Sequence, residues 1–402
     1  MKKLNISILL IITIISGLKA KNLDSLEIMA YVEFKKNNFK SAADLFSELL
    51  KDKQGTTEYI YKQAECFYFL NDIENAKKLF LEANKNDKAL ASLYLTKIYI
   101  LEENYDEAFN LLEEHLNSKY RLAQSKIKLD TDLKKLQSFD RWNNLWKNDY
   151  YTSRDELINE VNYLKKYRKY EEALDLLNEQ FNKGCKSYKL FALKGDILFD
   201  MEQYHLAINE YSQAIKSTKR FPEYFIKRAE SYFNLQELQK AENDYLYIID
   251  KNPAEVQYYR RLAQIALKQK HYSKANNYMN NYLKYYSDDT DALFEFGTIY
   301  YESGSYFNAL KYYNKVLKLH QDNEDYYIAR GKTYLKTNTW KFAENDFSMA
   351  LDLNPNNSNI YLNRGIARQK QGKIKEACYD WEKSATLGNK QAVVYLSDYC
   401  EN

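Results

Sequence analysis

Small and apolar residues recur with helical spacing along most of the chain, and the spacing itself returns every 34 residues. The stretch 324–357 illustrates the unit. In each half, positions i, i+4 and i+7 are small or apolar: Tyr327, Gly331 and Tyr334, then Ala343, Phe347 and Ala350. Turn-prone residues 336–339 separate the halves, and Pro355 follows the second. The pattern predicts two amphipathic helices in an antiparallel hairpin.

The 34-residue frame continues in both directions. It needs no insertion through seven units, which start at Arg154, Tyr188, Pro222, Val256, Thr290, Glu324 and Ser358. Position 20 is alanine in every one, and position 24 is always large and apolar or aromatic. Three further units start at Leu23, Thr57 and about Ala89, and the third is two residues out of step. The chain therefore reads as one hairpin motif repeated about ten times.

The motif resembles the tetratricopeptide repeat (TPR). The stretch 324–357 has the family's aromatic, Gly, Tyr, Ala, Phe, Ala and Pro at positions 4, 8, 11, 20, 24, 27 and 32. The resemblance implies an all-α fold, a right-handed α-solenoid with an irregular helical break and a C-terminal capping helix. It also implies protein–protein interaction without catalysis or a cofactor.

We expect five parts along the chain. They are a signal peptide (1–20), a block of three repeats (21–122), an irregular connector (123–153), a block of seven repeats (154–391) and the end of a capping helix (392–402). The connector carries two apolar stripes, predicting two irregular helices: Leu129, Leu133 and Leu136, then Trp142, Leu145 and Trp146. It is either a degenerate repeat that continues the core or a bend or docking element between the blocks.

The first twenty residues are typical of a secretory signal. Lys2 and Lys3 precede an apolar run over 6–15 that is too short to span a bilayer, and cleavage after Ala20 would leave Lys21 first. An uncleaved anchor or a cytosolic start is the alternative. The ending 372–400 resembles secreted bacterial TPR proteins, so we expect a periplasmic or extracellular location; the endoplasmic-reticulum lumen is the alternative.

The charge balance and the absence of catalytic motifs exclude several classes of function. Of 59 basic residues, three lie in the leader, which leaves 56 against 56 acidic ones, so there is no overall basic field for nucleic acid or anionic lipid. The four histidines lie in four repeats without an HExxH pair, and residues 365–373 do not form a phosphate loop. We therefore expect no metal site, no cofactor and no enzyme activity, and no membrane span in the mature chain.

Two functional classes remain. The first is an extracytoplasmic scaffold that binds a protein or peptide; the second is a lumenal or periplasmic co-chaperone that binds unfolded clients. No repeat carries the Lys and Asn of the family's carboxylate clamp at positions 5 and 9, which disfavours binding of cytosolic chaperone tails.

Stacked TPR hairpins curve, which turns positions 2, 5, 9, 12 and 13 of the first helix inward. We predict a partner-binding groove from these positions, formed by Arg260, Gln264, Phe294, Tyr301, Ile328, Lys332 and Lys336. The earlier part of the groove is acidic, with Asp196, Asp200 and Glu230, and the later part is basic, with Lys268 and Lys370 added to the cations above. Such a surface suits an extended or helical peptide with an apolar anchor. The alternative is that these charges serve only solubility.

The cysteines give one more prediction. Cys378 lies ten residues before Gly388 and Cys400 twelve after it, so antiparallel helices joined there hold both at one height. We predict a disulfide between them, with two separate buried thiols as the alternative. Cys66 and Cys185 lie in distant repeats and should stay unpaired.

Overall fold

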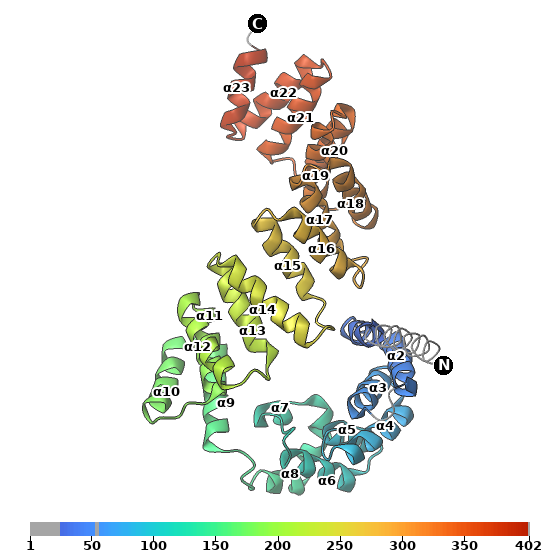
Figure 1. Cartoon of the computed structure of the whole chain (residues 1–402), viewed down its shortest axis with the longest axis vertical. Helices are drawn as coiled ribbons and strands as arrows, with labels where there is room; N and C mark the ends of the chain where they lie inside the picture. Colours follow the sequence, from blue (N-terminus) through green and yellow to red (C-terminus); the bar gives the residue numbers. More distant parts are fainter. Residues whose placement is uncertain (1–24, 53–55, 401–402) are drawn as a thin grey trace, which may run out of the picture. The chain divides into compact units, whose positions relative to one another are not determined.

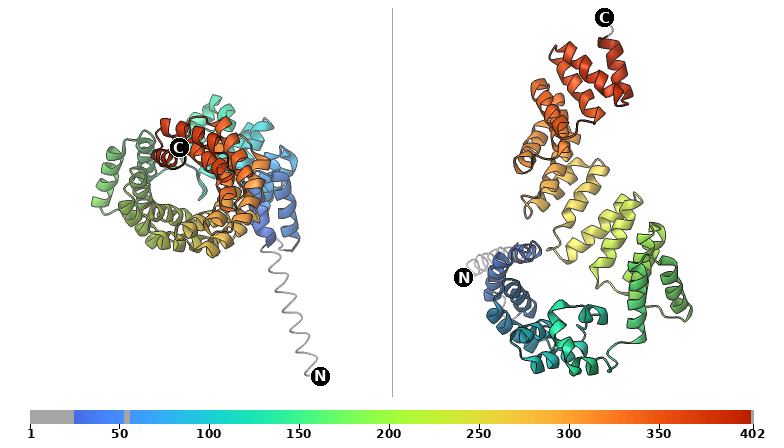
Figure 2. Two further views of the ribbon diagram at one scale, coloured as in Figure 1. Left: turned by 90° about the horizontal axis from the view of Figure 1, so that it is seen from above. Right: turned by 180° about the vertical axis from the view of Figure 1, so that it is seen from behind.

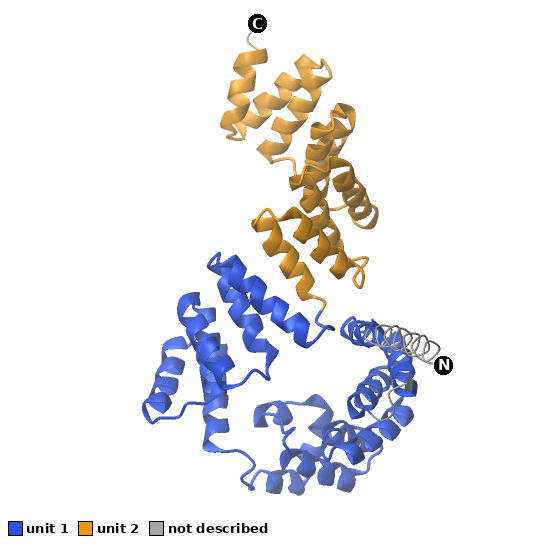
Figure 3. Ribbon diagram, viewed as in Figure 1, with its two compact units in different colours: residues 1–255 blue, residues 256–402 orange. Residues whose placement is uncertain are grey.

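The computed structural model describes residues 25–52 and 56–400, and every regular element within them is a helix. The predicted signal peptide, residues 1–20, lies outside this part. Consecutive helices pack as antiparallel hairpins (Figures 1 and 2). The chain divides into two compact units, Met1–Glu255 and Val256–Asn402, coloured separately in Figure 3. Each is a right-handed α-solenoid, the predicted fold class.

Unit 1 contains the first repeats, the connector and the beginning of the seven-repeat block. After a helix over residues 25–35, its helices are α2 (Phe39–Asp52), α3 (Thr57–Phe69), α4 (Ile73–Asn86), α5 (Ser92–Leu101), α6 (Tyr105–Leu116), α7 (Gln124–Lys128), η1 (Thr131–Ser138), α8 (Asp140–Leu145), α9 (Ser153–Lys166), α10 (Tyr170–Asn182), α11 (Tyr188–Asp200), α12 (Tyr204–Ser217), α13 (Pro222–Asn234) and α14 (Leu238–Lys251).

Unit 2 contains four complete hairpins and a final single helix. Its helices are α15 (Tyr258–Lys268), α16 (Tyr272–Leu283), α17 (Thr290–Glu302), α18 (Tyr306–Leu319), α19 (Glu324–Lys336), α20 (Trp340–Leu353), α21 (Ser358–Lys370), α22 (Ile374–Thr386) and α23 (Lys390–Tyr399). In each hairpin we call the first helix A and the second helix B.

Position 15 of each repeat makes the turn between helices A and B. It has a left-handed backbone in all ten repeats, at Asn37, Asn71, Glu103, Arg168, Glu202, Gln236, Lys270, Gly304, Asn338 and Gly372. The backbone N–H of the residue that follows position 15 donates to the carbonyl five residues earlier, near the end of helix A. Lys169, for example, donates to the Leu164 carbonyl at 2.9 Å, and this carbonyl would otherwise lack a partner within the helix. Glu103 occupies position 15 only if the third repeat starts at Ala89. The turn therefore fixes the register of that repeat.

The core follows the repeat frame. The ten alanines of position 20 are fully buried, and so are the large side chains of position 24, from Phe46 in the first repeat to Trp381 in the last. Position 8 is small because the position 24 ring packs directly on it. A Cβ added to Gly331 would lie 2.9 Å from Cε1 of Phe347, inside van der Waals contact.

The connector differs from the prediction of two helices. It forms three short ones, α7, η1 and α8, which pack on the α5–α6 hairpin. Leu133, Leu136, Trp142 and Leu145 are buried there, whereas Leu129 is 80% exposed, so its assignment to the first stripe was wrong. The reason is a change of helix type: a 3₁₀ helix aligns residues three apart, which pairs Leu133 with Leu136 and leaves Leu129, at the end of α7, out of phase.

Candidate partner-binding surface

The predicted groove residues lie on successive A helices of unit 2. Arg260 and Gln264 belong to α15, Phe294 and Tyr301 to α17, and Ile328, Lys332 and Lys336 to α19. We call this surface the helix-A face, and it continues over α21 and α23. The 34-residue period places equivalent positions on each helix, so side chains at one position form a row along the face.

Arg260 is occupied by contacts within the protein. Its Nε and Nη2 donate to the Glu295 carboxylate at 3.0 and 2.8 Å, and its Nη1 donates to Asp289 at 3.4 Å. Gln264 donates to the same Glu295 at 2.9 Å. The hydrogen bond to Glu295 raises the pKa of Arg260 further above its usual range. This cluster joins α15 to α17, so the charge of Arg260 is neutralised before any partner arrives.

A pocket of about 380 Å³ lies beside this cluster. Arg260, Gln264 and Tyr282 line it together with the exposed Arg261, which donates to the Gln264 side chain at 3.1 Å. The predicted pair Arg260 and Gln264 therefore forms a pocket wall, and Arg261 is the cation there that lacks a carboxylate partner among the described residues.

Phe294 and Ile328 form an apolar row at position 5. The Phe294 ring lies 5.5 Å from the Tyr313 ring and 5.1 Å from the Tyr326 ring, and both row residues pack on the buried cluster around Phe347 while staying partly exposed. Tyr301 packs its ring at 5.6 Å from Tyr306 at the far end of α17, and burial raises the pKa of its hydroxyl.

The row extends beyond the residues named from the sequence. Leu362 on α21 and Leu396 on α23 occupy the same position 5, and both pack around Trp381. Leu396 remains partly exposed, whereas Leu362 is buried. The repeat frame contained this signal, because position 5 is apolar in each of these helices.

Charges of opposite sign flank the row. Lys332 and Lys336 are exposed and have no ion-pair partner in the described parts of the chain. At the N-terminal ends of the same helices, a pocket of about 510 Å³ is lined by acidic residues that include Asp291, Asp322 and Asp325. The helix-A face of unit 2 thus has an apolar centre, a basic edge and an acidic edge.

The acidic stretch predicted in unit 1 is partly neutralised. Asp196 and Asp200 lie 3.5 and 3.6 Å from the Lys165 ammonium, and Asp196 also accepts a hydrogen bond from the Tyr211 hydroxyl at 2.8 Å. These carboxylates connect α9, α11 and α12. They are less available to a partner than Lys332 and Lys336 are.

Sequence reasoning missed a recurring ion pair, which we call the Arg–Asp bridge. Arg330 on α19 donates to both oxygens of Asp346 on α20 at 2.6 and 2.7 Å, and its Nη1 donates to Asn314 on the preceding α18 at 2.8 Å. The same arrangement recurs twice: Arg228 with Asp244 and Ser212, and Arg364 with Asp380 and Ser348. The partners lie 16 residues apart on either side, a spacing that the sequence shows.

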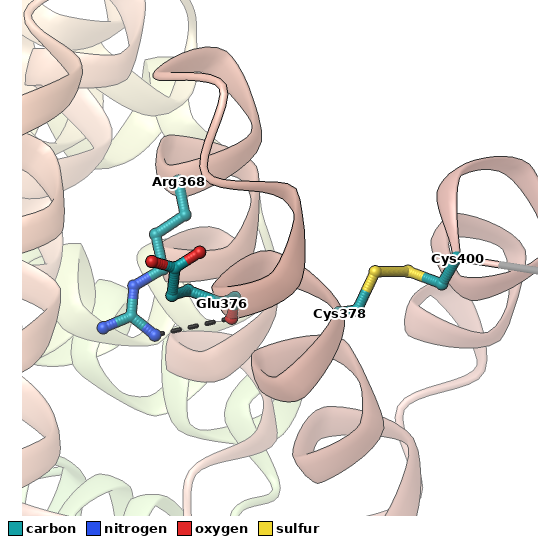
Figure 4. The surroundings of a disulfide bond; sticks show 4 residues. All are labelled: Arg368, Glu376, Cys378 and Cys400. Carbon is teal, nitrogen blue, oxygen red and sulfur yellow. Dashed lines mark hydrogen bonds between the residues drawn. A yellow bond between two sulfur atoms is a disulfide. The ribbon is translucent and has the colours of Figure 1, made fainter. Parts of the chain in front are cut away.

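The last hairpin is joined to the final helix by a disulfide. Cys378 on α22 and Cys400 after α23 are bonded, with 5.9 Å between their Cα atoms (Figure 4). Gly388 has a left-handed backbone between the helices, and the Asn389 side chain accepts the N–H of Gln391 to begin α23. Cys66 and Cys185 are unpaired.

The described residues contain no group of His, Cys, Asp and Glu side chains arranged to hold a metal ion. Among the same residues, no helix combines the length and apolar character that crossing a membrane requires.

Comparisons with known proteins agree with this architecture. A TPR repeat model matches residues 195–236 and 297–338, and two tetratricopeptide repeat models match residues 58–88 and 347–379. No curated protein matches the chain in sequence.

Among solved structures, the C-terminal part of a TPR repeat-containing protein from Cytophaga hutchinsonii is similar at 17% identity and a TM-score of 0.53, covering 60% of this chain and 99% of that one. A tetratricopeptide repeat protein from Parabacteroides merdae is similar at 19% identity and a TM-score of 0.46, covering 62% and 98%. The repeat pattern, the hairpin packing and the matched models show that this chain is built from tetratricopeptide repeats.

Proposed function

We propose that the protein is an extracytoplasmic scaffold that binds a protein segment on the helix-A face of unit 2. One observation carries the proposal: the partly exposed apolar row of Phe294 and Ile328 lies beside Lys332 and Lys336, two exposed cations without ion-pair partners in the described residues. An extended or helical segment with an apolar anchor and acidic neighbours fits this surface.

The apolar row should supply most of the binding energy. A buried anchor at the centre of an interface contributes about 2 kcal/mol or more, whereas exposed rim charges contribute little and are screened by salt. Arg260 and Gln264, which Glu295 already engages, should hold α15 against α17 rather than contact the partner.

Export is part of the proposal. The tripartite leader supports it, and so does the Cys378–Cys400 disulfide, since such bonds persist in oxidising compartments. Intact mass of protein purified from its own host tests this. A mature chain that begins at Lys21 is expected, and retention of Met1 would contradict export by signal cleavage.

Pull-down from the native cell envelope separates a scaffold from a co-chaperone. One stoichiometric partner supports the scaffold, and many unfolded clients support the co-chaperone.

The partner's affinity for two double variants then tests the surface. Phe294→Ala with Ile328→Ala should weaken binding strongly and leave helicity intact; Lys332→Glu with Lys336→Glu should mainly change its salt dependence.

Matched controls lie on the B helices of the same unit. Phe307→Ala with Met349→Ala removes two exposed apolar side chains, and Lys318→Glu with Lys341→Glu reverses two exposed charges. Both controls should bind as the parent does. If the helix-A variants also bind as the parent does, this face is not the site, and the Trp142 and Trp146 segment is tested next.

A further inference from the structure

A pocket in the first three repeats is built partly by the connector. It has a volume of about 400 Å³ and is lined by α3, α5, the end of α6 and the segment 120–130. The carboxylate of Asp130 in this segment forms an ion pair with the Lys97 ammonium on α5 at 2.8 Å, and this pair holds the segment over the A helices. A regular repeat would leave this face open, whereas here Leu122 and Asp130 form a wall.

Charged groups at the pocket are neutralised within the protein. Glu65 is paired with Lys62 at 2.7 Å and also accepts the Tyr94 hydroxyl at 3.1 Å. Lys97 lies between Asp130 and a second carboxylate at 2.8 and 2.9 Å. A charged ligand would have to compete with these pairs, so the pocket favours an uncharged one.

Two neutral polar groups at the pocket lack partners. His115 is 3% exposed, and its Nε2 accepts the N–H of Leu122 at 3.3 Å, which places the ring proton on Nδ1. That Nδ1 has no hydrogen-bond partner, but it is closed off from solvent, so a molecule in the pocket does not reach it. Burial, with the nearby Arg121, lowers the pKa of His115 to about 4, so the ring is neutral at pH 7. The Tyr61 hydroxyl also has no partner among the described residues.

The remaining lining is apolar. Leu90 and Leu93 line the pocket alongside Leu122, and the Tyr61 and Tyr94 rings lie edge to face at 6.1 Å. Leucines and aromatic rings bind the body of a small apolar molecule, while a few placed donors fix its orientation.

We propose that this pocket binds an uncharged group with an apolar or aromatic body and a hydrogen-bond-acceptor oxygen, which accepts from the Tyr61 hydroxyl. A free small molecule has this chemistry, and so does an aromatic residue of a peptide with its main-chain carbonyl. The site shares no residue with the proposed surface of unit 2, so either can fail without the other.

The experiment titrates the full mature chain with N-acetylphenylalaninamide, an uncharged aromatic probe, using saturation-transfer NMR. N-acetylphenylalanine and phenethylamine are its anionic and cationic counterparts. The uncharged probe should bind at least tenfold more tightly than either. Equal affinity for a charged probe, or no binding of the uncharged one, would overturn the proposal.

Variants locate the binding. Leu122→Trp fills the pocket from its rim and should reduce affinity at least tenfold, whereas Leu129→Trp, at an 80% exposed position outside the pocket, should bind as the parent does. Tyr61→Phe removes one hydroxyl and should lower affinity about fivefold, as expected for one hydrogen bond. Unchanged affinity in Leu122→Trp would refute the site, and circular dichroism checks that both tryptophan variants fold.

A final comparison identifies the source of the ligand. If the capped peptide acetyl-Gly-Ser-Phe-Ser-Gly-amide binds at least tenfold more tightly than N-acetylphenylalaninamide, the pocket recognises a residue of a partner chain. Equal affinity of the two probes supports a free small molecule.

Discussion

Two pairs of hairpins in unit 2 share one backbone and differ in how helix A meets helix B. In α15–α18 positions 7 and 23 carry no charge, and in α17–α18 the Phe296 and Tyr312 rings at these positions lie 4.5 Å apart. In α19–α22 the same positions carry Arg–Asp bridges, Arg330 with Asp346 and Arg364 with Asp380. The alanine of position 20 is fully buried in all four hairpins. The repeat therefore specifies its backbone with few positions and leaves this contact variable.

The apolar contact and the Arg–Asp bridge should differ in the free energy that their formation costs. An apolar contact gains from burial alone, whereas a buried ion pair must first lose its hydration. Asp346 shows this cost, because burial raises the pKa of its carboxyl even though Arg330 binds it at 2.6 Å. The Arg330 side chain connects α18, α19 and α20. The protein should therefore lose stability when only one partner of the bridge is removed.

Breaking one bridge should have the largest effect. Arg330→Ala leaves the buried Asp346 without its cation and should cost about 3–5 kcal/mol of unfolding free energy, measured by urea denaturation. Phe296→Leu in the apolar hairpins should cost less than about 1.5 kcal/mol. The double replacement Arg330→Met with Asp346→Leu should lie near the parent or above it. If the single variant is as stable as this double variant, the bridge carries no desolvation cost.

The disulfide should give the next effect, confined to the end of unit 2. Closing the 22-residue separation between Cys378 and Cys400 contributes ~3 kcal/mol on the chain-entropy model. Reduction should accelerate amide hydrogen exchange in α22 and α23 and leave α15 and α16 unchanged, because repeats interact mainly with their neighbours. Alkylation of Cys378 in native, unreduced protein would show that the bond is absent.

Substitution at position 8 should have similar effects on stability in the two pairs of hairpins. A Cβ at Gly297 would lie 2.5 Å from the Tyr313 ring, and one at Gly365 would lie 2.4 Å from Trp381. Gly297→Ala and Gly365→Ala should therefore each cost about 1–3 kcal/mol in urea denaturation. Trp381→Leu should offset part of the cost at Gly365, which a double-mutant cycle measures. A large cost in only one hairpin would mean that the backbones differ after all.

The repeat frame explains how much the sequence could predict. Positions 8, 20 and 24 act within one hairpin, so their periodic residue types predicted the helices, the register and the core, and the structure confirms them. Interactions between repeats were harder to foresee. Arg260 meets Glu295 of the next repeat, and nothing in the residue types at positions 5 and 9 indicated that this cation was already paired.

The prediction for the connector was wrong for a different reason. A stripe drawn at 3.6 residues per turn includes Leu129, whereas the 3₁₀ helix η1 has three residues per turn. Leu133 and Leu136 are buried as predicted, and Leu129 is exposed. The helix-A face was predicted from position alone, and the structure supplies Leu362 and Leu396 as its extension. That this face binds a partner stays a prediction.

The smallest effect expected is a sensitivity to acid that Glu344, on helix B of an ion-paired hairpin, should confer. Burial alone would raise the pKa of Glu344, but hydrogen bonds from Lys373, Arg368 and Gln371 outweigh it and lower the pKa to about 2, from an ordinary value of 4.5. A folded-state pKa below the unfolded one means that the carboxylate stabilises the fold above about pH 4.5, and that this contribution is lost as the pH falls toward 2.

Water reaches the Glu344 cluster, so the contribution should be ~1–2 kcal/mol. Urea midpoints of the parent and of Glu344→Gln, measured between about pH 2 and 7, isolate it, because every other carboxylate is common to both proteins. The variant should be less stable at pH 7 and converge with the parent at the acid end. Hydrogen exchange should place the difference between the two proteins in α20–α22, because Glu344 on α20 binds Arg368 on α21 and Lys373 just before α22. Parallel profiles for the two proteins at every pH would show that Glu344 does not distinguish the ion-paired hairpins from the apolar ones.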